Sequence, residues 1–199
     1  MTRVHLAFTP DELPDTTSPE DRAGFEAFIE TMQPAFGAPE IPKAAAGFAI
    51  IARAPKLASL IVGLNQHMAF ELPWTSQRAD LRELMIQTLN MHFQCDFNFQ
   101  SHLAKAEQRY GLPVELQAAI PYWKVSNIFT EEQRLVIEFT LAAASGTVSD
   151  ELFARVVDQF GEAGATEFTF GVAWWSFWAI LVGAIGPQHD FGYRTDQAD

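Results

Sequence analysis

The feature that most constrains the fold is an uncharged segment near the end of the chain, residues 168–186 (FTFGVAWWSFWAILVGAIG). A segment of this length and composition can cross a bilayer as one helix. Its flanks do not suit a membrane: Glu162 and Glu167 precede it, His189 and Asp190 follow it, and no Lys or Arg lies close to either end. We therefore expect it to be the buried central helix of a soluble protein.

Helix signals also occur along the rest of the chain. Ser18 precedes a proline and two acidic residues, which is typical of a helix N-terminus. Thr130 with Gln133 three residues later predicts a capping box, and Ser149 is placed to cap the next helix, which should end near Gly161. No window shows a sustained alternation of apolar and polar residues. The sequence therefore predicts an all-α bundle of about seven to eight helices.

Three parts follow one another in this prediction. Residues 1–17 are polar and rich in Pro, Asp and Thr, so we expect an extended N-terminal arm. Residues 18–187 form a single helical domain, long enough to bury a core without disulfides. Residues 188–199 form a polar C-terminal tail.

Composition excludes several classes of function. The formal net charge of −12 argues against nucleic acid, whose phosphates need clustered Lys and Arg, and against an anionic membrane surface. The chain has one cysteine, which rules out an internal disulfide and a thiolate zinc site. The N-terminus has no apolar signal-peptide core. These features predict a cytoplasmic protein.

A possible reactive pair lies in the middle of the chain. Cys95 and His102 are seven residues apart, so a continuous helix would place both on one face, with Asn98 between them. A bend near Gln94 would put Cys95 at the start of that helix, where the helix dipole lowers a thiol pKa. His102 could accept the thiol proton, and Glu83 on the preceding helix could orient the pair. The alternative is that both are ordinary core residues.

The segment around these residues resembles the core motif of the carboxymuconolactone decarboxylase and AhpD-like (alkylhydroperoxidase D-like) families. That motif is a Glu, eleven residues, a Cys, two residues, a second Cys or another residue, three residues and a His. Here Glu83, Cys95, Asn98 and His102 stand in register within residues 81–113. The similarity extends over about residues 44–186 and implies an AhpD-like helical bundle.

Two departures from the family bear on the chemistry. Asn98 replaces the second cysteine of the AhpD-type Cys-x-x-Cys pair, so an oxidised Cys95 would need an outside thiol to be resolved. Gln94 stands where the family often has Gly before the Cys, and Trp175-Ser176 stand where it often has Tyr-Asn.

The resemblance therefore implies three hypotheses. The first is a cofactor-free decarboxylase-like enzyme acting on a small carboxylated lactone or ring, with His102 as general acid, Glu83 fixing its tautomer or acting as base, and Cys95 a neighbour or packing residue. The second is an AhpD-like hydroperoxide reductase that uses Cys95 with an external thiol. The third is a non-catalytic oligomeric helical protein.

Further predictions concern the pocket and partners. Asn98, Tyr122 and Trp175 are the expected substrate-pocket residues, although the aromatic rings could equally be core or subunit interface. His67 and His92 show no metal-binding spacing, so no metal is expected. The expected partners are a small-molecule substrate and further copies of the chain, as a dimer, trimer or hexamer, because 17 Phe and 5 Trp need burial and family members usually assemble.

Overall fold

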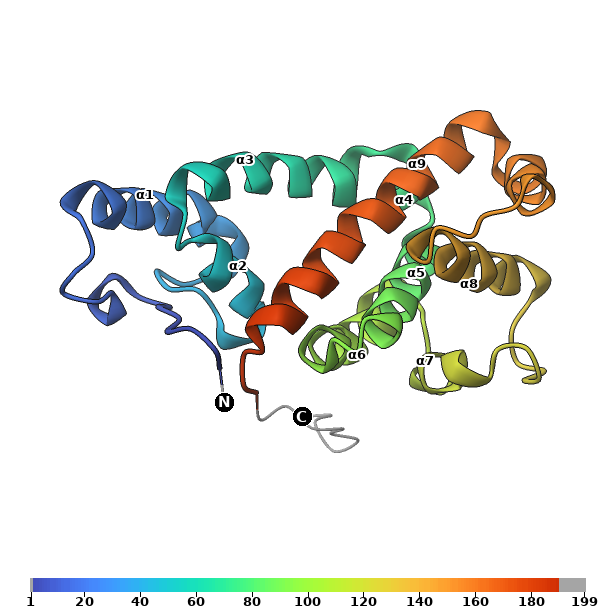
Figure 1. Ribbon diagram of the computed structural model, residues 1–199, viewed down its shortest axis with the longest axis horizontal. Helices are drawn as coiled ribbons and strands as arrows, with labels where there is room; N and C mark the ends of the chain where they lie inside the picture. Colours follow the sequence, from blue (N-terminus) through green and yellow to red (C-terminus); the bar gives the residue numbers. More distant parts are fainter. Residues whose placement is uncertain (1, 190–199) are drawn as a thin grey trace.

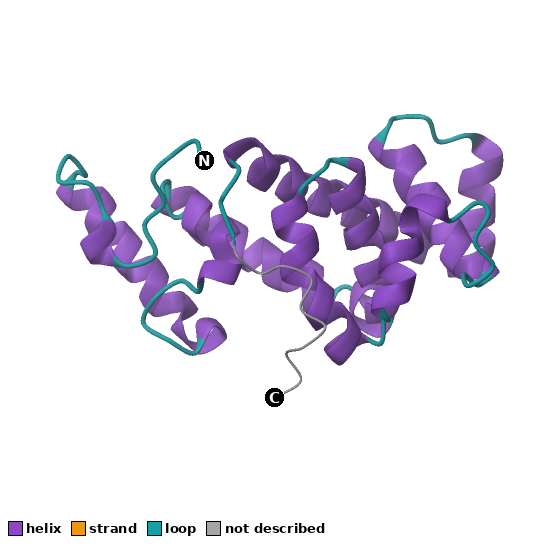
Figure 2. Ribbon diagram, turned by 90° about the horizontal axis from the view of Figure 1, so that it is seen from below, coloured by secondary structure: helices purple, strands orange, loops and turns teal. Residues whose placement is uncertain are grey.

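The computed structural model describes residues 2–189, and in this part of the chain it contains helices and loops but no strand (Figure 2). The all-α prediction is confirmed. The α-helices of the described residues are α1 (Pro19–Phe36), α2 (Ala46–Ile51), α3 (Pro55–Gln66), α4 (Pro73–Gln77), α5 (Ala79–His92), α6 (Asp96–Tyr110), α7 (Val114–Ala119), α8 (Glu131–Ala144) and α9 (Asp150–Ile185). Short 3₁₀ turns cover Pro10–Glu12, Lys43–Ala45 and Ile120–Tyr122, and a π-helical turn covers His67–Glu71.

The predicted helix starts are confirmed by their hydrogen bonds. Ser18 Oγ accepts from the Asp21 backbone N–H at 3.1 Å at the start of α1. Thr130 and Gln133 form the reciprocal capping box of α8, and Ser149 Oγ caps α9. Each bond satisfies a backbone N–H that the first turn of a helix leaves without a partner.

Gly161 divides α9 into two helical segments. Its φ of 72° and ψ of 168° are not helical, and this combination is accessible almost only to glycine. The chain bends there, at the orange end of α9 in Figure 1. The expected boundary near Gly161 is therefore confirmed.

Helix α9, with its long segment after Gly161, lies between α2 and a set of four other helices. It contacts α2 on one side and α4, α5, α6 and α8 on the other (Figure 1). Its Phe168 stacks on Trp74 of α4, with ring centroids 4.3 Å apart, and packs against Phe139 of α8 at 4.8 Å. The predicted central position is thus observed.

Burial of this helix is partial. Among the described residues α9 is the one helix long and apolar enough to cross a membrane, and 39% of its most apolar window is buried within the chain. Phe170, Phe177 and Ile180 face outward from it. Leu57, Leu60 and Leu64 of α3 are also exposed, so the isolated chain carries uncovered apolar surface on both helices.

The N-terminal arm packs against the domain. Ala7 and Leu13 are buried, and the Ile41 backbone N–H donates to the Phe8 carbonyl at 2.9 Å. Arg3 donates to carbonyl oxygens in the last turn of α9, including Gly183 O at 3.2 Å, where a cation complements the negative end of the helix dipole. Of the predicted tail, residues 190–199 lie outside the described residues.

Candidate functional site

The candidate site is built on the hairpin of α5 and α6. The core positions of α5 include buried polar residues, Arg82, Glu83, Gln87, Thr88 and Asn90, which is unusual for a helix enclosed by α6, α8 and α9. Such residues are retained in a core only when they have partners.

The chain reverses between the two helices at Gln94. Gln94 has a φ of 54°, and it is the only non-glycine residue with positive φ in the described part of the chain. This left-handed conformation favours glycine, which is the residue that the resembling families often carry at this place. The predicted bend is confirmed, and it sets α6 alongside α5.

Glu83 and His102 meet across this hairpin. His102 Nδ1 lies 2.8 Å from Glu83 Oε2, and the Glu83 side chain is 2% exposed. Arg82 donates to the other carboxylate oxygen from Nη2 at 3.1 Å and from Nε at 3.3 Å. The result is a chain of hydrogen bonds from buried Arg82 through buried Glu83 to partly buried His102.

Arg82 is itself held from three sides. Its Nη1 donates to the carbonyls of Ala69 at 2.7 Å and Thr75 at 3.2 Å. Its guanidinium also lies 4.6 Å from the centroid of the Tyr110 ring, within cation–π range. Arg82 is therefore fixed in place behind Glu83.

The electrostatics keep Glu83 ionised. Burial alone would raise its pKa, but hydrogen-bonded His102, together with the positive charges of Arg82 and Lys105, outweighs burial and holds the Glu83 pKa below its usual value of 4.5. An ionised carboxylate can only accept hydrogen bonds, so His102 Nδ1 carries a proton and donates it to Glu83 Oε2 in a hydrogen bond. This leaves His102 Nε2 as the nitrogen available to a ligand.

These residues line a cavity of about 170 Å³. An engineered protein cavity of roughly 150 Å³ holds a benzene molecule, so the space suits a single small ring. The walls come from α5, α6 and α9, from α2 and the turn before it, and from the end of α3 and the π-helical turn after it. Those with polar groups include Asn65, Asn90, Asn98, Ser101, His102 and Lys105.

The predicted residues divide between this cavity and other places. Glu83, His102, Asn98 and Trp175 all line it. Tyr122 does not: it is 67% exposed in the 3₁₀ turn after α7, so the prediction that it lines the pocket is wrong. Tyr122 follows α7 in the chain and does not line the cavity, which the sequence pattern did not indicate.

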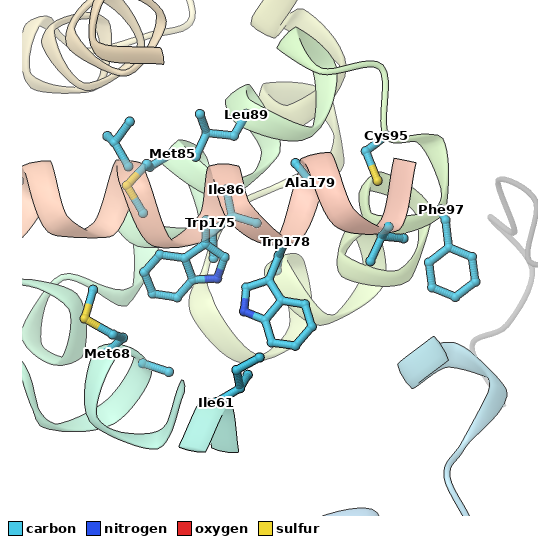
Figure 3. Close-up of a cluster of buried hydrophobic side chains, with 14 of the residues drawn as sticks. Ile61, Met68, Met85, Ile86, Leu89, Cys95, Phe97, Trp175, Trp178 and Ala179 are labelled. Atoms are coloured by element: carbon cyan, nitrogen blue, oxygen red, sulfur yellow. The ribbon is translucent and has the colours of Figure 1, made fainter. Parts of the chain in front are cut away.

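Cys95 also lies outside the cavity. It is the N-cap residue of α6 with a non-helical φ of −87° and ψ of 78°, so the seven-residue helical register does not direct its side chain. The side chain is 1% exposed and packs against α9, where a methyl group on Gly183 would lie 4.0 Å from Cys95 Sγ. Figure 3 shows Cys95 beyond the two labelled tryptophans, near Phe97.

The environment of Cys95 opposes the predicted thiolate. Burial raises the pKa of the thiol above its usual 9.0, and the nearby Asp96 carboxylate adds to the rise, while backbone groups of Asn98 and Gly183 offset part of it. Desolvation therefore outweighs the helix N-terminus, so the neutral thiol is favoured.

No protein-family model, curated protein or solved structure matches the chain. The family resemblance drawn from residues 81–113 therefore stays a prediction.

The cavity residues that the sequence reasoning missed include Arg82, Asn90, Lys105 and Trp178. Lys105 follows His102 by three residues, so helical spacing alone places both on one face. Arg82 could have been found as a cation directly beside Glu83, where a buried carboxylate needs a partner. Trp178 follows Trp175 by three residues in the same way.

Asn90 has a fixed amide orientation that no local pattern predicts. Gln117 donates to two backbone carbonyls, Leu103 at 3.1 Å and Leu112 at 2.8 Å, so its Oε1 is left to accept from Gln87 at 2.6 Å. Gln87 then accepts from Asn90 Nδ2 at 3.0 Å. This chain of buried amides fixes the amide group of Asn90, which lines the cavity and whose Oδ1 has no donor among the described residues.

Within residues 2–189 no group of three or more His, Cys, Asp or Glu side chains is placed to hold a metal ion. The chemistry that the arrangement can perform with its own residues is proton transfer. His102 supplies the exchangeable proton, and Glu83 and Arg82 hold its ring in place.

Proposed function

We propose that the chain is a cofactor-free acid–base enzyme of the carboxymuconolactone decarboxylase type, acting on a small carboxylated lactone or ring compound. The observation that carries the proposal is the 2.8 Å contact between His102 Nδ1 and Glu83 Oε2 in the wall of a ring-sized cavity. A carboxylate behind a histidine fixes its tautomer and stabilises its protonated form.

The proposed reaction is loss of carbon dioxide followed by protonation. The substrate carboxylate approaches Lys105, which lines the cavity and makes no ion pair with any described residue. The carbon–carboxylate bond breaks, carbon dioxide leaves, and the electron pair passes into the conjugated ring. Protonated His102 then gives its Nε2 proton to the ring carbon and regains a proton from solvent.

The thiol alternative is less well supported by the geometry. A peroxide-reducing Cys95 would need access to solvent and thiolate character, whereas its side chain is 1% exposed and burial raises its pKa. The non-catalytic alternative would be favoured if aromatic rings of α9 filled the pocket. Trp175 and Trp178 instead line an open space.

The test is carbon dioxide release from a panel of carboxylated unsaturated lactones. We expect His102→Gln to lower turnover by roughly 100-fold or more, because the general acid is removed. Cys95→Ser should leave turnover unchanged. Loss of turnover in Cys95→Ser, or peroxide consumption with dithiothreitol that disappears in that variant, would instead favour the thiol enzyme.

We also propose that the protein assembles into a homo-oligomer, as a dimer, trimer or hexamer. The support is the exposed apolar side chains of α3 and α9, which water penalises in a monomer. Light scattering should give a multiple of the chain mass. A monodisperse monomer would exclude this proposal.

A further inference from the structure

One wall of the cavity carries a buried N–H group that needs an acceptor. Trp178 is 8% exposed, and its Nε1 has no hydrogen-bond partner among the described residues. A buried donor without an acceptor is costly, so native proteins rarely leave one. Four other buried polar side-chain atoms in the described residues lack a partner, but none belongs to a residue that lines the cavity.

A second indole faces the same space. Trp175 precedes Trp178 by three residues on α9, is also 8% exposed and lines the same cavity. Figure 3 shows the nitrogen-bearing edges of the two rings turned toward one another. No described residue accepts from the Trp175 N–H either. By contrast, Trp174 donates to Asn65 Oδ1 at 3.3 Å and does not line the cavity.

The Trp178 ring is held in place by its neighbours. It packs against Phe48 at 5.7 Å, Phe177 at 5.3 Å and Trp174 at 5.9 Å between ring centroids. Gly47 makes room for it, since a Cβ at that position would lie 3.2 Å from the indole ring. Donors fixed in this way do not need to reorganise when charge develops on a ligand.

We infer that the indole N–H groups of Trp175 and Trp178 together bind one carbonyl oxygen of the ligand. The catalytic role of this oxygen site rests on the proposed function. When carbon dioxide leaves, the electron pair of the broken bond moves through the conjugated ring onto this oxygen, giving an enolate. Proton transfer from His102 Nε2 to carbon then restores the carbonyl. The two indoles stabilise the negative oxygen between these steps.

The charges of the cavity residues indicate which group of the ligand each of them binds. Lys105 on α6 lines the cavity and suits the substrate carboxylate, whereas Arg82 on α5 is already paired with Glu83. The two uncharged N–H donors lie on α9 and suit a carbonyl. The ligand class is therefore a small unsaturated ring with a carboxylate and a conjugated carbonyl.

The test uses the indole N–H signals of the ¹⁵N-labelled protein, which Trp→Phe variants assign. The probes are 2(5H)-furanone, which has the carbonyl, and 2,5-dihydrofuran, which lacks it. We expect furanone to shift the Trp175 and Trp178 signals downfield and dihydrofuran to shift neither. Furanone binding should weaken roughly two- to tenfold in Trp178→Phe and in Trp175→Phe.

Trp123→Phe is the matched control, because Trp123 follows the 3₁₀ turn after α7 and does not line the cavity, and this variant should bind furanone as the wild type does. Equal shifts from both probes, or none from furanone, would overturn the inference. These binding measurements do not depend on turnover. If furanone shifts neither indole signal but turnover still depends on His102, only this inference is wrong. Shifted indoles without turnover would support the oxygen site and remove only the proposed reaction.

Discussion

Cys95 and His102 belong to the same helix–turn unit but lie in opposite environments. The spacing of seven residues predicted one shared face, yet His102 lies in the cavity wall and Cys95 packs against the end of α9. The difference arises at one residue: α6 begins at Asp96, so Cys95 is an N-cap whose side chain does not follow the helical period. Helical periodicity does not predict the side-chain direction of the first residue outside a helix.

The comparison also separates two effects of burial. Glu83 and Cys95 are both almost fully buried, but the pKa of Glu83 is lowered and that of Cys95 is raised. Glu83 has His102 and Arg82 as partners, whereas the Cys95 thiol is desolvated and lies near the Asp96 carboxylate. Partners decide whether a buried group stays charged.

The largest expected effect comes from removing the Glu83 carboxylate, the buried group that stays charged. Glu83→Ala leaves the Arg82 guanidinium buried without a counter-charge, which should cost about 3–5 kcal/mol of unfolding free energy in urea denaturation. The matched control is Glu132→Ala, which removes a carboxylate from the half-exposed Arg78 and should cost about 1 kcal/mol or less. Equal losses in the two variants would mean that Arg82 does not depend on Glu83.

The second prediction concerns access to the thiol. Because the Cys95 side chain is buried, a disulfide reagent such as DTNB should label it about 100-fold or more slowly in the folded protein than in urea, through local opening only. The control is a Cys95→Ala protein carrying Val125→Cys, since Val125 is 84% exposed. Rapid labelling of Cys95 in the native protein would revive the peroxidase alternative.

The third prediction is that the two groups limit stability at opposite ends of the pH range. The folded pKa of Glu83 is lowered, so its contribution is complete above 4.5 and is lost as the pH falls through the folded value. The folded pKa of Cys95 is raised, so its contribution is complete below 9.0 and is lost as the pH rises above that value. Unfolding free energies of the wild type, Glu83→Gln and Cys95→Ala across this range should show the acid limb reduced in the first variant and the alkaline limb in the second. The same limbs in all three proteins would contradict the assignment.

Much of the fold follows from local chemistry that the sequence displays. Ser18, Thr130 and Ser149 fix helix starts through their own side chains, and Gly161 breaks α9 because its φ suits glycine. Glu83 and His102 were predicted together because one turn at Gln94 pairs the two helices. No such local rule exists for Tyr122, whose position depends on how the loop after α7 packs in three dimensions.

The smallest expected effect tests whether the contact between Cys95 and Gly183 serves packing alone. A Cβ at Gly183 would lie 3.8 Å from Cys95 Cβ and 4.0 Å from its Sγ, which is ordinary contact. Gly183→Ala should therefore stabilise the last turn of α9 by about 0.5–1 kcal/mol, because alanine is the better helix former, and it should not change lactone turnover. Thermal unfolding and the turnover assay measure the two effects. A drop in turnover would mean that the space beside the thiol serves the reaction, and the contrast between Cys95 and His102 would then be one of degree.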